Sequence, residues 1–136
     1  MKVLKIILPF LLLGLLSCNE DASPNDQDCP TELLCTEQFV SLTFSPRANG
    51  EFVELDSYYT QNLDNGNTYI FNDQNNLPIS EFYIVITDSE MDEVAKDGTN
   101  LRFFGTKDNQ LVIEEDFIVG HDCCHVIPLE GPFGDF

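Results

Sequence analysis

The sequence LRFFGTKDNQLVIEEDFIV, residues 101–119, contains two strand-like segments on either side of a polar turn. Apolar, β-branched and aromatic residues are frequent in both segments, as is typical of strands. We predict that 101–106 and 111–119 pair as a hairpin across Lys107–Gln110. This hairpin places the C-terminal half of the chain in a β-sheet.

The residues before this hairpin also alternate between apolar and polar types with a period of two, which is the strand signature. Hairpin turns are expected at 46–50 and at 64–67, where Asn and Gly favour positive backbone φ angles. The segment 82–86 is apolar on both faces and suits a central strand. The predicted strands are 40–45, 53–56, 69–71, 82–86, 101–106, 111–119 and 121–127.

A single short helix is expected near residues 89–96. Asp88 or Ser89 can cap it, and Gly98 follows its end. About seven short strands with one helix predict an all-β fold, an antiparallel two-sheet sandwich of the immunoglobulin or transthyretin type.

The N-terminus has the pattern of a secretory signal peptide over residues 1–17. Lys2 and Lys5 precede the apolar run 6–16, which is about half the roughly 20 residues that a membrane-spanning helix needs. Residues 15–18, Leu-Leu-Ser-Cys, resemble a bacterial lipobox. This resemblance implies that Cys18 is lipidated and becomes the first residue of the mature protein, whose membrane contact is then this lipid anchor.

The domain boundaries follow from composition. Residues 18–34 form an acidic tether that is too polar to fold alone, 35–130 form the β-sandwich domain, and 131–136 form a C-terminal tail. Glu20 and Asp21 resemble the acidic export signal of Bacteroidetes lipoproteins. That resemblance implies an outer-membrane lipoprotein, exposed at the cell surface or otherwise facing the periplasm.

The chain is strongly acidic, with a formal net charge of −18 at pH 7. Such a charge repels phosphate backbones and argues against nucleic-acid binding. A partner would be a basic or neutral protein or glycan. One alternative that the charge alone supports is an acidic inhibitor of a basic hydrolase.

The densest group of reactive residues is Gly120–Val126, which contains two of the five cysteines and both histidines. If 121–127 is one strand, His121, Cys123 and His125 share a face and could bind zinc or copper. The preferred interpretation is structural, because exported domains with an even number of cysteines usually form disulfides. We therefore expect Cys29, Cys35, Cys123 and Cys124 to form two disulfides.

The adjacent pair constrains the disulfide pairing, since a Cys123–Cys124 bond would close a strained small ring. Cys29 and Cys35 are expected each to bond one member of this pair, with the order left open. The first bond would be worth about 4–5 kcal/mol on the loop-entropy model. Because the pair points to opposite faces of a regular strand, either Gly120 introduces a bulge or one bond lies at the edge.

Two short motifs resemble those of a group of small Bacteroidetes outer-membrane lipoproteins. They are Cys35-Thr36-Glu37-Gln38-Phe39 and Asp122-Cys123-Cys124-His125-Val126, the latter preceding Gly131-Pro132. The resemblance implies an immunoglobulin-like or carboxypeptidase-regulatory-like β-sandwich and no reaction.

No catalytic motif was found in the sequence: it contains no nucleophile elbow, no phosphate-binding glycine loop and no His-Glu-x-x-His helix. Oxygen ligands at Asp64–Asn65 and at 72–76 leave calcium as a weaker possibility. The sequence therefore predicts a lipid-anchored envelope lipoprotein that acts as a non-catalytic interaction or accessory module, with no cofactor. An envelope metal-binding protein is the alternative.

Overall fold

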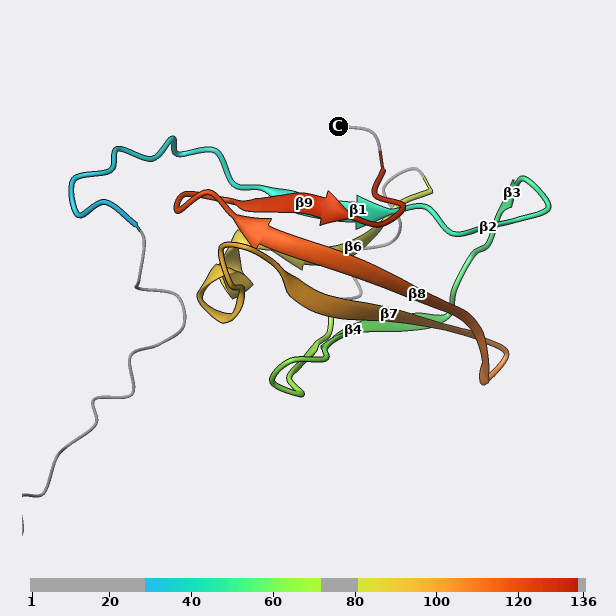
Figure 1. Cartoon of the computed structure of the whole chain (residues 1–136). Coiled ribbons are helices and arrows are strands. Elements are labelled where there is room, and N and C mark those ends of the chain that lie inside the picture. The colour runs from blue at the N-terminus through green and yellow to red at the C-terminus, as the bar shows by residue number, and fades with distance from the viewer. Residues whose placement is uncertain (1–28, 72–80, 135–136) are drawn as a thin grey trace, which may run out of the picture.

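The structure is a computed structural model that describes residues 29–71 and 81–134 (Figure 1). The predicted signal peptide, Cys18 and most of the tether lie outside the described residues. Within them the regular structure is almost all β-strand, with a single short 3₁₀ helix, which confirms the all-β prediction. The strands are β1 (Ser41–Phe44), β2 (Arg47–Ala48), β3 (Glu51–Phe52), β4 (Ser57–Asn62), β5 (Thr68–Tyr69), β6 (Tyr83–Thr87), β7 (Thr99–Lys107), β8 (Gln110–His121) and β9 (Val126–Glu130).

The strands form antiparallel sheets of unequal size. The large sheet has the order β5-β4-β7-β8-β9, β1 pairs with β6, and β2 pairs with β3. The hairpin predicted from 101–119 is the β7–β8 pair, in which Phe103 lies opposite Glu115. Its turn contains Asp108 and Asn109 at φ angles of 52° and 59°, a conformation that Asn and Asp tolerate better than most residues.

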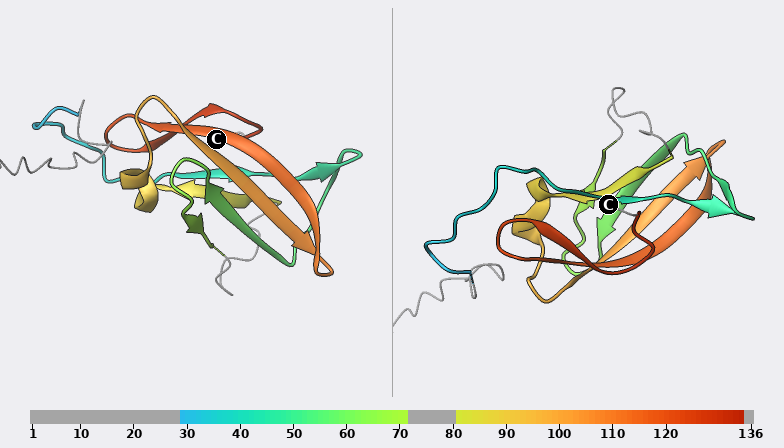
Figure 2. Two further views of the ribbon diagram at one scale, coloured as in Figure 1. Left: turned by 60° about the horizontal axis from the view of Figure 1, so that its bottom comes forward. Right: turned by 90° about the horizontal axis from the view of Figure 1, so that it is seen from above.

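The core lies between the β1–β6 pair and the large sheet, in a two-layer arrangement (Figure 2). Phe44 of β1 contacts Phe103 and Phe117 of the large sheet edge to face, each at a centroid distance of 5.4 Å. Tyr83 of β6 contacts Tyr58 of β4 at 4.9 Å. Aromatic side chains from both layers therefore supply much of the buried apolar surface.

The prediction of a strand at 53–56 was wrong, because residues 53–56 connect β3 to β4 without strand pairing. The strand is β4, whose inward positions include the polar residues Thr60 and Asn62, both 0% exposed. Asn62 is satisfied there, since its amide donates to the Tyr69 hydroxyl and to the Glu93 carbonyl, both at 3.1 Å. A hydrophobic pattern cannot identify a buried face that depends on polar contacts.

The helix is shorter than predicted and has a different cap. A 3₁₀ helix, η1, spans Asp88–Glu93, and Thr87 caps it in a capping box with Glu90. It ends because Val94 has an extended backbone and is fully buried. The described residues contain no helix of the length and apolar character needed to cross a membrane.

The segment predicted as a C-terminal tail adds to the domain. Phe133 pairs with Phe44 of β1 through an isolated bridge, and its ring lies 4.9 Å from that of Phe117. The Gly134 N–H donates to the Thr43 carbonyl at 2.8 Å. The packed domain therefore continues to Gly134.

Candidate functional site

The residues singled out by the sequence meet at one end of the molecule. We call this the braced end: residues 29–40, the first turn of η1, and the β8–β9 turn (Figure 1). The prediction of one strand over 121–127 was wrong, since β8 ends at His121 and β9 begins at Val126. His121, Cys123 and His125 therefore do not share a strand face.

The turn between β8 and β9 is organised by Asp122. Its Oδ1 accepts from the backbone N–H groups of Cys124 and His125, at 2.9 and 2.8 Å. The hydrogen bond from Cys124 is the main reason that the pKa of Asp122 lies below its usual value; burial acts in the opposite direction. Cys123 takes a positive φ of 77°, so the chain reverses between the two cysteines.

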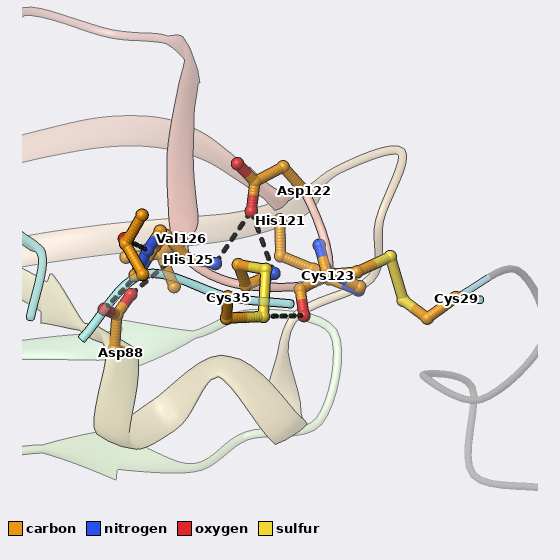
Figure 3. Close-up of a disulfide and its surroundings, with 10 residues drawn as sticks. Cys29, Cys35, Asp88, His121, Asp122, Cys123, His125 and Val126 are labelled. Carbon is orange, nitrogen blue, oxygen red and sulfur yellow. Dashed lines mark hydrogen bonds and ion pairs between the residues drawn. A yellow bond between two sulfur atoms is a disulfide. The ribbon is translucent and has the colours of Figure 1, made fainter. Parts of the chain in front are cut away.

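The structure contains both disulfides of the expected pattern and fixes their order. Cys29 bonds Cys123 and Cys35 bonds Cys124, with Cα–Cα distances of 5.6 and 5.3 Å (Figure 3). Because the adjacent pair lies in a turn, no bulge at Gly120 is needed. Gly120 is required for another reason, since an added Cβ would lie 2.6 Å from the Lys96 carbonyl oxygen.

A line of hydrogen bonds joins Thr36, His125 and Asp88. The Nδ1 atom of His125 lies 2.8 Å from Asp88 Oδ2, and its Nε2 atom lies 2.9 Å from the Thr36 hydroxyl. A carboxylate only accepts hydrogen bonds, so Nδ1 carries the proton of the neutral ring. It follows that Nε2 accepts from the Thr36 hydroxyl.

Asp88 joins three segments of the braced end. Its carboxylate accepts from the Val40 N–H at 2.8 Å and from the Val126 N–H at 2.9 Å, in addition to His125. Burial raises the pKa of Asp88, but these hydrogen bonds together bring it below its usual value. Asp88 is therefore an ionised anchor for the first and last strands.

His121 has the opposite tautomer and an incomplete set of partners. Its Nδ1 accepts from the Cys123 N–H at 3.1 Å, so the neutral ring carries its proton on Nε2. The residue is only 4% exposed, and Nε2 has no hydrogen-bond partner among the residues that the structure describes.

The metal set proposed from the sequence is not assembled. Cys123 is in a disulfide, and both ring nitrogens of His125 are engaged by Thr36 and Asp88. The structure instead groups Cys29, His121 and Cys123, with potential ligand atoms all within 4.8 Å of one another.

The structure also gives little support to the calcium site that the sequence left open at Asp64–Asn65. Both carboxylate oxygens of Asp64 accept from Asn100, and the Asn65 amide donates to Glu93. The segment 72–76 lies outside the described residues.

Sequence reasoning missed Thr36 and missed the role of Asp88. Asp88 was considered only as a helix cap, and Thr36 only as part of a motif beside Cys35. Their positions could have indicated a role: Thr36 directly follows Cys35, and Asp88 directly follows the last residue of β6. Nothing in the sequence indicated that they meet at His125, because 89 residues separate Thr36 from it.

A second feature with binding potential is the outer face of the large sheet. The rings of Tyr59 and Phe104 stack there at 4.8 Å. Beside them Arg102 pairs with Glu114 at 3.0 Å and with Asp116. This combination of partly exposed rings and charges suits contact with a protein or glycan surface.

Comparison with known proteins adds no relative. A scan of protein-family models, a search of curated proteins and a search of solved structures each returned no match for this chain.

Proposed function

We propose that the protein is a lipid-anchored lipoprotein of the cell envelope whose β-sandwich acts as a non-catalytic interaction or accessory module. The observation that carries the proposal is the attachment of the first described residues, Cys29 and Cys35, to the β8–β9 turn by two disulfides. Disulfides persist in oxidising compartments outside the cytoplasm, as the signal peptide requires. They hold the domain at the point where the tether from Cys18 enters it.

This arrangement gives the domain an orientation relative to the anchor. The tether enters at the braced end, and the β7–β8 turn lies at the far end of the molecule (Figure 1). A force on the tether would act on the disulfides before it reaches the hydrogen bonds of β1. The body of the sheet would therefore remain folded while it contacts a partner.

The anchor is tested by expressing the chain with its own signal peptide in a bacterium fed labelled palmitate. The chain should incorporate label and partition with outer membranes, and Cys18→Ala should remove both properties. Protease treatment of intact cells then separates surface exposure from a periplasmic orientation. Label retained in Cys18→Ala would contradict lipidation at Cys18.

The non-catalytic part of the proposal has its own test. Thr36, His125 and Asp88 have the hydroxyl–imidazole–carboxylate order of hydrolase triads. If they act only as a structural lock, a fluorophosphonate probe should leave Thr36 unmodified. Probe attached to Thr36 in the native chain, and lost in His125→Gln, would assign a nucleophile and overturn this part.

The partner-binding surface is assigned to the outer face around Tyr59 and Phe104. Purified chain should bind isolated cell envelopes, and Tyr59→Ala with Phe104→Ala should weaken binding while leaving the disulfides intact. The control is Lys107→Ala at the far turn, which should bind as the native chain does. Equal binding by all variants would remove this face from the proposal.

A second candidate is an acidic inhibitor of a basic hydrolase, favoured by the net charge of −18. A cavity of about 440 Å³ is lined in part by Glu130, which offers a carboxylate to a basic side chain. Its other acidic residues, Asp64 and Asp116, are engaged by Asn100 and Arg102. Inhibition of a lysozyme-like enzyme should then weaken with salt, since exposed charges are screened within about 8 Å at physiological ionic strength. Absence of inhibition at low salt would exclude it.

A further inference from the structure

The buried nitrogen of His121 is the feature that the proposed function leaves unexplained. Buried polar atoms nearly always have a hydrogen-bond partner, and one without a partner calls for a specific cause. Nε2 of His121 has none among the described residues, although the side chain is almost fully buried. The residue lies beside the Cys29–Cys123 disulfide (Figure 3).

We propose that reduction of the Cys29–Cys123 disulfide converts this end of the molecule into a zinc site with Cys29, Cys123 and His121 as ligands. Thiolate and imidazole are the ligands that Zn²⁺ prefers in proteins. In a tetrahedral site with Zn–S distances of about 2.3 Å, two sulfur ligands lie about 3.8 Å apart. The three candidate atoms already lie within 4.8 Å of one another, so small movements complete the set.

The redox step has a defined balance. A dithiol donates two electrons and two protons, the Cys29–Cys123 bond breaks to give two thiols, and the dithiol becomes a cyclic disulfide. Zn²⁺ then displaces the two thiol protons and binds the thiolates. His121 binds through its unprotonated ring nitrogen, Nδ1 in the tautomer described above, which gives up the hydrogen bond from the Cys123 N–H. Three protein ligands leave the fourth position to water.

The surrounding contacts favour Cys29, Cys123 and His121 as ligands over the other cysteine and histidine of the β8–β9 turn. The ring nitrogens of His125 are held by Thr36 and Asp88, so His125 is not available without breaking that line. Cys124 is held by its separate bond to Cys35, which keeps the β8–β9 turn attached to residues 29–40 while the other bond is open. The acidic surface of the chain attracts cations toward the site.

The test uses the full chain purified in detergent, as the oxidised protein and after limited reduction with dithiothreitol to two free thiols per chain, followed by anaerobic removal of the reductant. A non-reducing peptide map shows that the Cys35–Cys124 bond is still closed. Zinc per chain is measured by elemental analysis, and Co²⁺ is added in parallel because its visible spectrum reports tetrahedral thiolate ligation. Reduced protein should bind one equivalent of Zn²⁺ and show the thiolate spectrum. The oxidised protein should bind none.

The variants identify the ligands. The pair Cys29→Ser with Cys123→Ser keeps the Cys35–Cys124 disulfide and should bind no Zn²⁺ under the same conditions. His121→Gln should weaken binding by at least the 10–100-fold (roughly) that loss of an outer-shell partner costs. His125→Gln is the matched control and should bind as the native chain does.

Several results would overturn the site. They are no zinc in the partly reduced native chain, zinc in the oxidised chain, and zinc bound by the Cys29/Cys123 variant. Equal loss in His121→Gln and His125→Gln would also overturn it, because an unfolded reduced chain would bind metal through any histidine. The site is independent of lipidation, so failure of either proposal leaves the other standing.

Discussion

Residues 29–40 and the centre of the large sheet are held in place by different interactions. In the first region residues 30–39 are exposed, including Leu34 at 96%, and none of them pairs in a strand. In the second, Phe103 is fully buried between two layers. The first region gains little from apolar burial, so disulfides and the Asp88 carboxylate hold it. The second is stabilised by packing and by the backbone hydrogen bonds of β7 with β4 and β8. Covalent and polar links are therefore found where the chain cannot bury enough apolar surface.

The largest effect is expected when both disulfides are removed, and it should not be additive. The bonds span 94 and 89 residues, so either one alone closes nearly the same loop. On the loop-entropy model, loss of one bond costs about 2–3 kcal/mol because the survivor still closes that loop, and loss of both costs roughly 7 kcal/mol. Chemical denaturation of the two paired Cys→Ser variants and of the fourfold variant measures this coupling.

Additive losses would show that the two bonds stabilise the braced end independently. An unfolded fourfold variant agrees with the prediction, whereas an unfolded variant with one bond still present contradicts it. A non-reducing peptide map of each variant serves as the control for pairing.

The next largest effect tests the packed region. Phe103→Ala should destabilise the fold by about 3–5 kcal/mol, the usual cost of removing a buried aromatic side chain. Phe104→Ala is the matched control, because its side chain lies on the opposite face of β7 and stacks only on Tyr59 there. Thermal and denaturant unfolding measure both. Equal losses would mean that the outer face is as well packed as the core.

A smaller effect is expected at the polar anchor. Asp88→Asn leaves one side-chain carbonyl oxygen for three donors, the Val40 N–H, the Val126 N–H and the His125 ring. The substitution should lower the free energy of unfolding by about 1–3 kcal/mol at neutral pH. The pKa of Asp88 is lowered in the folded state, so its stabilisation is complete above the unfolded pKa of about 3.9. It is lost as the pH falls through the lower folded pKa. The difference between native protein and variant should therefore shrink in acid.

The control for the anchor is Asp92→Asn on the exposed side of η1, which should leave stability unchanged. A difference between native protein and Asp88→Asn that persists at pH 2 would show that shape, not charge, makes Asp88 an anchor. Free energies of unfolding measured across the acid range decide between the two.

The smallest effect is expected for Arg102→Gln on the outer face. Its partners Glu114 and Asp116 are exposed, with side-chain exposures of 48% and 64%, and water screens such pairs. Stability should change by no more than the error of the measurement, and added salt should not alter that outcome. A clear loss would mean that this face supports the fold as well as a partner.

Local patterns predicted the sheet, and they failed where structure depends on contacts between distant residues. The hairpin from 101 to 119 was predictable because both strands and their turn residues are contiguous. β4 was not, because its inward positions include the polar residues Thr60 and Asn62, and Asn62 is buried through partners elsewhere in the chain. The two disulfides were expected from cysteine count and adjacency, whereas their order is seen only in the folded chain, in a turn where Cys123 has a positive φ.

The sequence by itself determined the β-rich class, the hairpin turns, the acidic charge, and the expectation that four cysteines bond across the domain. These depend on side-chain type, spacing and local backbone preference. Only the tertiary structure decided that 122–125 is a turn, that Asp88 and Thr36 bind opposite sides of His125, and that His121 lies buried against Cys29–Cys123. Each of these requires residues far apart in the chain to approach within a few ångströms, and packing, not local preference, brings them together.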